Sequence, residues 1–189
     1  MSLILTNIEQ HVHLSASEQS YFTDMLEEQR LDKKAFVQHA GDPCHFIHFV
    51  TEGILRAFFI GKDGKDSTLM FAKKEWWITD MDNFLNERPA ALNIQVVAPA
   101  RVLSLSRKNL DLLFDNVPLF NNFFRILMQN AYCREQRRSL QTLSLTAKER
   151  YDLFMQKYPE IASQVTQKQI ASYLGITPEF LSHIRGQRD

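Results

Sequence analysis

The hydrophobic period of this sequence changes near Ser106 from a β pattern to a helical one, and that change constrains the fold more than any other feature. Between about residue 34 and Ser106, short runs rich in Phe, Ile and Val alternate with turn residues, a pattern typical of an all-β sandwich or barrel. Beyond Ser106 the apolar residues recur at helical spacing. The sequence therefore predicts a β-domain followed by a run of helices.

Turn residues divide the β-region into strands. Asp63-Gly64 predicts a hairpin turn, because glycine adopts a positive φ without steric cost. The run before this turn, residues 45–61, is rich in Phe and Ile and is interrupted by Gly53. Further strands are expected over residues 68–71, 93–97 and 101–106.

Capping residues mark the helices on both sides of the β-region. Ser15 and Glu18 form a capping box that predicts an amphipathic helix over residues 16–29. A short helix is expected over residues 109–116. A second capping box, Thr146 with Glu149, opens a helix that ends before Pro159.

Residues 118–141 are predicted to form one long helix with two apolar faces. Such a helix must bury both faces, one against its own domain and one elsewhere. A fully buried helix in one larger core is the alternative, but a small β-domain offers only one surface. We therefore predict pairing with the same helix of a second copy. The predicted dimer interface is Leu119, Phe123, Ile126, Leu127 and Asn130.

Residues 166–188 contain the most specific motif in the chain. The small residue Ala171, the turn residue Gly175 and the aliphatic Leu181 have the spacing of a helix-turn-helix. A capping box opens the first helix, and a Thr-Pro pair opens the second. The internal face of the two helices would be Ile170, Leu174, Ile176, Leu181 and Ile184.

The outward face of the second helix carries groups that suit DNA. Glu179 can accept a hydrogen bond from a cytosine amino group, and Arg185 can reach guanine or a phosphate. Free N–H groups at the two helix starts, with Lys168, suit phosphate contacts. An ordinary helical hairpin with a solvated outer face is the alternative. The predicted DNA-binding residues are Thr166, Gln167, Lys168, Thr177, Pro178, Glu179, Ser182, His183, Arg185 and Arg188.

Charge is distributed unevenly along the chain, although the net charge is zero. Residues 1–100 contain 9 Lys and Arg against 14 Asp and Glu, whereas residues 101–189 contain 13 against 8. Such an asymmetry favours a polyanionic partner for the second half. Residues 142–189 alone are only modestly basic, with six Lys and Arg against five Asp and Glu.

Composition argues against several other classes of protein. The two cysteines, Cys44 and Cys133, cannot supply a disulfide framework or a four-cysteine iron–sulfur cluster, and they fit a reducing cytoplasm. No apolar run is long enough to cross a membrane, and the N-terminus lacks the features of a signal peptide.

His45, His48 and Glu52 are the candidates for a metal site in the β-region. His48 and Glu52 could share a strand face, but His45 would point the other way. No phosphate-binding loop or nucleophile motif appears, so we expect neither a metal site nor an enzyme.

Together these features resemble the Crp/Fnr family of bacterial transcription regulators. The matching segments are Gly41-Asp42, FVTEGILR at 49–56, Asp63-Gly64 and residues 166–185, so the resemblance covers almost the whole chain. The sequence ITPEFLSHIR at residues 176–185 is similar to that of a Bacteroidetes-type subgroup of short family members.

The resemblance implies an α+β fold in three parts. Residues 1–117 would form a cyclic-nucleotide-binding-like β-roll, which is a jelly roll or double-stranded β-helix. Residues 118–141 would be a dimerisation helix, and residues 142–189 a helix-turn-helix DNA-binding domain.

The resemblance also implies partners. We expect a cytoplasmic homodimer that binds a two-fold symmetric site on double-stranded DNA, contacts RNA polymerase and responds to an unknown small-molecule effector. In the family, an Arg-Glu pair and a later Arg contact the bases. Pro178, Glu179 and His183 stand at these positions, so only the glutamate is retained and a different operator is expected.

The β-roll of residues 1–117, which the resemblance implies is the sensor domain, departs further from the family pattern. Cyclic-nucleotide binders carry a short helix beginning Gly-Glu and then Arg-Ser/Thr-Ala, which together hold the cyclic phosphate. The corresponding stretch, residues 75–91, has no glycine, and its Arg88 stands among acidic residues. We therefore do not expect cAMP as the signal, and the cofactor stays unassigned. Candidate pocket residues are Trp76, Trp77, Asp80, Arg88 and Ala91, with buried core tryptophans as the alternative for the indoles.

A second interpretation retains the ligand-binding sensor domain but gives the helix-turn-helix no DNA-binding function. The helix-turn-helix could contact another protein, which the modest charge of residues 142–189 allows. DNA affinity that falls steeply with salt would exclude this interpretation.

Overall fold

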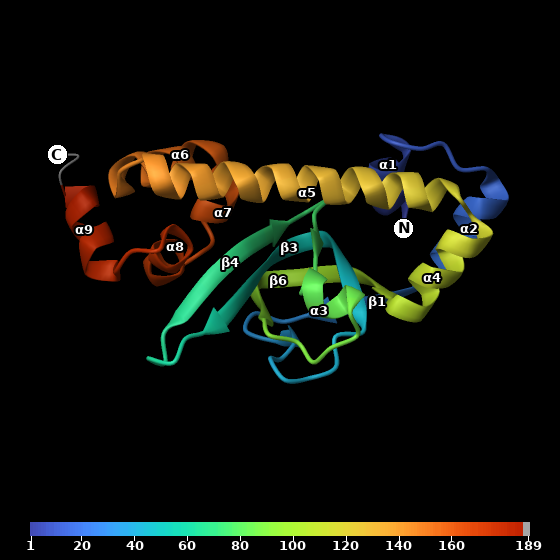
Figure 1. The fold of residues 1–189 in the computed structure, drawn as a ribbon, viewed down its shortest axis with the longest axis horizontal. Coiled ribbons are helices and arrows are strands. Elements are labelled where there is room, and N and C mark those ends of the chain that lie inside the picture. The colour runs from blue at the N-terminus through green and yellow to red at the C-terminus, as the bar shows by residue number, and fades with distance from the viewer. Residues whose placement is uncertain (187–189) are drawn as a thin grey trace.

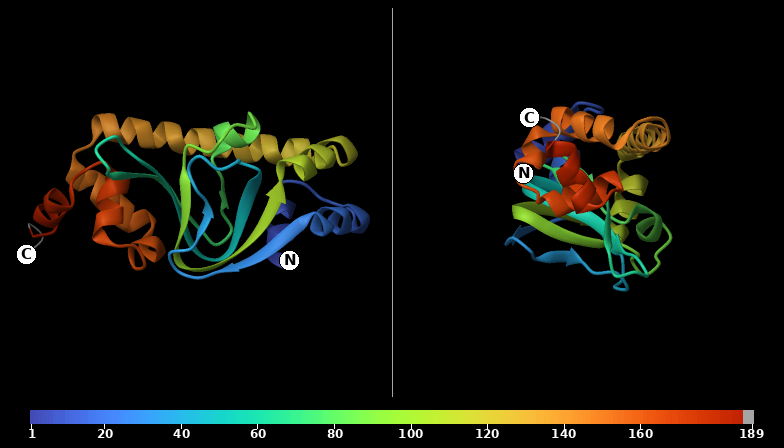
Figure 2. Two further views of the ribbon diagram at one scale, coloured as in Figure 1. Left: turned by 90° about the horizontal axis from the view of Figure 1, so that it is seen from below. Right: turned by 90° about the vertical axis from the view of Figure 1, so that its left-hand side faces the viewer.

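The computed structural model describes residues 1–186 of the chain and shows an elongated molecule (Figure 1). A twisted antiparallel sheet occupies the middle, and the long helix α5 (Leu119–Ser144) runs along one side of it. The last helices lie at one end of α5 and the first ones at the other end (Figures 1 and 2). This arrangement confirms the predicted α+β architecture of β-domain, long helix and C-terminal helical unit.

The N-terminal segment contains two short helices, α1 (Ser2–Glu9) and α2 (Ala16–Asp24). The predicted capping box at the start of α2 is present, since Ser15 N–H donates to the Glu18 carboxylate at 2.7 Å. The prediction of a helix as far as residue 29 is wrong. The helix ends at Asp24, and strand β1 (Leu26–Leu31) follows it. β1 pairs with β6, and this pairing satisfies its backbone N–H and C=O groups.

The sheet is antiparallel, with strand order β1-β6-β3-β4. Its long strands are β3 (Phe46–Ile60), β4 (Asp66–Lys73) and β6 (Asn93–Ser106), and the short strands β2 (Phe36–Gln38) and β5 (Trp77–Ile78) pair with β6 and β3. The predicted turn between β3 and β4 is confirmed, with Gly64 at φ 75°. The two strands predicted over 93–97 and 101–106 are one continuous strand, β6.

The helices after the sheet follow the predicted order closely. They are α4 (Arg107–Asn116), α5, α6 (Ala147–Lys157), α7 (Pro159–Ala162), α8 (Gln167–Leu174) and α9 (Pro178–Gly186). The short helix α3 (Met81–Leu85) lies earlier, between β5 and β6. Helix α5 continues beyond its predicted end at Gln141 as far as Ser144. Helix α7 was not predicted, because Pro159 ends α6 and at the same time opens the next turn.

Apolar packing joins the C-terminal helices directly to the sheet. Phe71 of β4 lies in one cluster with buried residues of α6 and α8, and its ring centroid is 6.3 Å from Phe154 and 5.5 Å from Tyr173. A separate cluster packs the first part of α5 on α1, α2 and the opposite end of the sheet. The C-terminal unit is therefore attached by a shared core as well as through α5.

The buried His48 makes stability depend on pH. Its Nδ1 lies 2.8 Å from Ser104 Oγ, and burial lowers the pKa of His48 from 6.5 to about 4. The unfolded chain therefore takes up this proton first, and stability is lost as the pH falls from about 6.5 toward 4.

We expect this group alone to lower the free energy of unfolding by about 2 kcal/mol between pH 7 and pH 5. Urea unfolding at the two pH values measures the loss. His48→Gln keeps a polar group beside Ser104 but does not titrate, so its loss should be smaller by that amount. An equal loss in both proteins would contradict this account.

Candidate functional site: DNA-binding face and ligand pocket

The predicted helix-turn-helix is present in α8 and α9. The Thr166 hydroxyl accepts from Gln169 N–H at 3.2 Å, and the Gln169 side-chain oxygen accepts from Thr166 N–H at 2.9 Å, which completes the capping box. Gly175 ends α8 in the left-handed conformation, at φ 68°. The Thr177 hydroxyl accepts from Phe180 N–H at 3.2 Å and opens α9. The internal face is buried at Ile170, Ala171, Leu174, Leu181 and Ile184.

The outer face of the motif is open to solvent. Glu179 is exposed, and hydrogen bonds from its own backbone N–H and from the Thr177 side chain lower the pKa of its carboxyl group. The carboxylate is therefore ionised and able to accept from a base amino group. Arg188 lies outside the described residues. The other predicted DNA-binding residues that are exposed are Thr166, Gln167, Lys168, Thr177, Pro178, Ser182, His183 and Arg185.

Phe180 is a further feature of this face. Its side chain is 48% exposed, although it lies in the first turn of a helix that packs on the domain core. An aromatic side chain here can contact a thymine methyl group in the major groove. Phe180 is not in the predicted DNA-binding set, although helical spacing places it on the outward face of α9.

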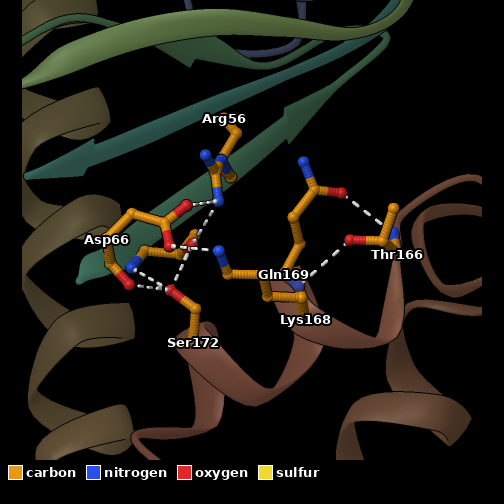
Figure 3. A network of polar contacts seen from close by, with 7 residues as sticks. Arg56, Asp66, Thr166, Lys168, Gln169 and Ser172 are labelled. Carbon is orange, nitrogen blue, oxygen red and sulfur yellow. Dashed lines mark hydrogen bonds and ion pairs between the residues drawn. The ribbon is translucent and has the colours of Figure 1, made fainter. Parts of the chain in front are cut away.

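A polar network holds α8 against the β3–β4 hairpin (Figure 3). The Ser172 hydroxyl accepts from Thr68 N–H at 2.8 Å and donates to the Asp66 carbonyl at 2.8 Å. The Asp66 carboxylate pairs with buried Arg56 at 2.8 Å and lies 4.0 Å from Lys168 Nζ. The orientation of the helix-turn-helix is therefore set partly by the sensor domain. Sequence reasoning missed this network because its members come from three separate elements, β3, β4 and α8.

Helix α5 strengthens the same junction. The Arg138 guanidinium donates to the carbonyl groups of Thr68, Leu69 and Tyr173, which belong to β4 and α8. It also lies 4.5 Å from the centroid of the Tyr173 ring. One side chain thus ties the long helix to both the hairpin and the helix-turn-helix.

A largely apolar pocket of about 380 Å³ lies between the sheet, α3 and α5. Of the candidate pocket residues, Trp76, Trp77 and Asp80 line this pocket, whereas Arg88 and Ala91 do not. Trp77 is 9% exposed and packs on the rings of Phe49, Phe123 and Phe124, so most of it belongs to the core. Trp76 is more open and contacts Tyr158 of the C-terminal unit, with ring centroids 5.9 Å apart.

The residues of the sensor do not fit a cyclic phosphate. The Asp80 carboxylate, 5% exposed, accepts from Ala91 N–H at 2.7 Å and Leu92 N–H at 3.0 Å. Backbone groups at the end of the stretch that corresponds to the phosphate-binding segment are thus already bonded to an internal anion. Arg88 pairs with Asp82 at 2.6 Å and is half-exposed. A phosphate would meet carboxylates here rather than free donors.

The predicted dimer interface on α5 divides between two faces. Phe123 is 1% exposed and belongs to the monomer core, so a partner helix cannot reach it. Leu127 packs against the same core, whereas Leu119 and Asn130 are exposed and Ile126 is half-buried. Leu119, Ile126, Cys133 and Leu140 recur every seventh residue, and we call this set the α5 stripe.

Within residues 1–186, no helix combines the length and the hydropathy needed to cross a bilayer. The same residues contain no cluster of three or more His, Cys, Asp or Glu side chains placed to hold a metal ion. His48, weighed above as a ligand, is buried beside Ser104, whereas Glu52 is exposed.

Comparison with known families gives a match for the β-domain. Residues 28–116 match the family model of the cyclic nucleotide-binding domain. Among curated proteins, the comparison found no matching sequence.

Solved structures identify the fold of the whole chain. The c-di-GMP responsive global regulator CLP of Xanthomonas campestris aligns with a TM-score of 0.76 and 13% identity, over 92% of this chain and 91% of that one. A putative Crp/Fnr family transcriptional regulator of Eubacterium rectale aligns with a TM-score of 0.74 and 16% identity, over 90% and 82%. The catabolite activator protein of Thermus thermophilus gives 0.59 and 20%, over 92% and 83%. The chain therefore has the fold of Crp/Fnr transcriptional regulators, and its residues 28–116 are similar to the cyclic nucleotide-binding domain family.

Proposed function

We propose that this chain is a homodimeric transcription regulator that binds a two-fold symmetric site on double-stranded DNA. The observation that carries the proposal is α9, whose inner face is buried and whose outer face is exposed from Thr177 to Arg185. A helix that ends a capped helix-turn-helix and leaves this face open suits the major groove. On the family resemblance, we place the protein in the cytoplasm, give it RNA polymerase as a partner and assign it no enzymatic activity.

The signal we propose is a small molecule other than a cyclic nucleotide. The pocket beside α5 has apolar walls, and its charged lining includes Glu75, Asp80, Asp82 and Glu135 with Arg134. Such a lining suits a neutral or cationic apolar compound better than a phosphate. Trp76 lines this pocket and also contacts Tyr158. A ligand that moves Trp76 would therefore change the contact between the β-domain and the DNA-binding unit. The expected mechanism is a shift between two dimer arrangements that changes the spacing of the α9 helices.

Two substitutions separate base contacts from phosphate contacts. Glu179→Ala should relax the preference at one base position, at a cost of about 1–3 kcal/mol for the preferred base. Lys168→Ala should weaken all sequences alike and reduce the salt dependence of binding by about one phosphate contact. Fluorescence anisotropy with labelled duplexes at several salt concentrations measures both effects. Equal losses on every sequence for both variants would contradict the assigned roles.

A protein partner for the helix-turn-helix is the second candidate. The exposed ring of Phe180 and the modest charge of residues 142–189 favour it. The same anisotropy titration decides between the two, because binding that weakens steeply with salt requires phosphate contacts. Binding that is weak and insensitive to salt would support the protein partner.

A further inference from the structure

A second pocket, of about 340 Å³, lies between the C-terminal half of α5 and the helices α6 and α8, and it shares Arg134 with the first pocket. Its walls include aromatic rings of Phe154, Tyr158 and Tyr173. Among the described residues that line it, none is acidic. Five are cationic: Arg134, Arg137, Arg138, Arg150 and Lys157.

Nearby acidic residues neutralise only part of this charge. Glu135 lies 3.5 Å from Arg134 and 3.6 Å from Arg138, and Arg138 is also engaged by the carbonyl groups of the hairpin and α8. Within residues 1–186, Arg137, Arg150 and Lys157 form no ion pair with a carboxylate. The pocket therefore gathers cations that the protein leaves uncompensated.

The Arg150 side chain has one nitrogen without a hydrogen-bond acceptor among the described residues. Its terminal nitrogens donate to the carbonyl groups of Leu145 at 2.9 Å and Leu174 at 3.3 Å, which fixes the guanidinium between α5 and α8. Its Nε is buried and has no hydrogen-bond partner in the described part of the chain. A buried donor without an acceptor costs free energy, so the Arg150 guanidinium, whose residue lines the pocket, lacks one of its acceptors within this part of the chain.

We propose that this pocket binds a phosphate-bearing small molecule with a planar ring, of the nucleotide class. Cations that repel one another in a confined space are stabilised by an anion with several acceptor oxygens, and guanidinium groups match phosphate geometry. The half-buried ring of Tyr158 offers a surface on which a flat ring can stack. The sensor pocket has the opposite character, since acidic side chains line it. This inference does not depend on DNA binding.

The test is a calorimetric titration of the full chain, without DNA, with ADP, pyrophosphate and adenosine as probes. We expect ADP to bind, pyrophosphate to bind more weakly and adenosine not to bind. Arg137 and Lys157 are exposed and lie on α5 and α6, so the double variant Arg137→Gln/Lys157→Gln should fold normally. It should lower the ADP affinity by about tenfold or more. Lys108→Gln, which removes an exposed cation of α4 outside the pocket, should leave the affinity unchanged.

Three results would overturn the proposal. The first is no heat of binding with ADP or pyrophosphate at millimolar concentration, in protein that unfolds cooperatively. The second is an ADP affinity that the double variant and Lys108→Gln leave equally unchanged.

The third result concerns the source of the phosphate. If ADP does not bind but the double variant reduces the salt dependence of DNA binding, the pocket takes a phosphate of the DNA backbone instead. A failure of DNA binding with ADP binding intact would count against the proposed function and not against this site.

Discussion

Replacing Gly53 by alanine should destabilise the sensor domain by about 3 kcal/mol, which is a severe effect for adding one methyl group. Gly53 interrupts β3 at φ 83°, a conformation that side chains rarely adopt. A Cβ there would lie 2.2 Å from the Pro99 carbonyl oxygen and 2.7 Å from the Ala100 Cα. Both are backbone atoms of the neighbouring strand β6, so the clash cannot be relieved by a side-chain rotation.

Gly64 supplies the matched control. Its φ of 75° is nearly the same, but an added Cβ would meet nothing within 4 Å. Gly64→Ala should therefore cost only the backbone strain, about 1 kcal/mol. Urea unfolding monitored by tryptophan fluorescence measures both variants. Equal losses would show that the close approach to β6 has no energetic consequence, and the account of this strand would be wrong.

Mild oxidation should convert the wild-type protein almost completely into a disulfide-linked dimer through Cys133. Cys133 is exposed and lies in the middle of the α5 stripe. In a parallel two-stranded coiled coil, residues repeated every seven positions face their own counterparts at a separation that suits a disulfide. Leu140 and Leu143, 59% and 85% exposed, continue the apolar surface toward the end of the helix.

Two variants test whether the cross-link reports the proposed dimer. Cys133→Ser should abolish it, whereas Cys44→Ser should not, because Cys44 is buried and burial raises the pKa of its thiol. Ile126→Glu places a charge in the stripe and should give monomers by analytical ultracentrifugation. Leu112→Glu, on the exposed side of α4, is the control for an added charge. A dimer that survives Ile126→Glu and does not cross-link through Cys133 would contradict the proposed interface.

Local signals in the sequence predicted the elements whose ends are fixed by neighbouring residues. The capping boxes at Ser15, Thr146 and Thr166 are all present, as is the left-handed Gly175. Elements whose formation depends on distant partners were missed or misjudged. The predicted helix includes residues 26–29 of β1, because the strand character of these residues comes from pairing with β6, more than seventy residues later. This dependence on tertiary context is what local patterns do not contain.

The candidate sites divide in the same way. Exposure of the outer face of α9 follows from helical periodicity, so the face could be predicted. By contrast, Phe123 has the spacing of an outward residue and yet turns into the core, since the sheet and Trp77 cover that side of α5. The docking of Ser172 on the hairpin and the cationic pocket depend on contacts between separate units, which periodicity does not reveal.

The most direct test of the central claim is a selection of DNA duplexes from a random pool by the purified protein at moderate salt. The selection is carried out with and without a small-molecule extract of cells. We predict enrichment of a two-fold symmetric motif whose half-sites are about one helical turn apart, because a symmetric dimer presents two α9 helices at that spacing. Enrichment only with the extract would show that the effector is required. No enrichment under either condition would contradict the claim that this helix-turn-helix binds specific DNA.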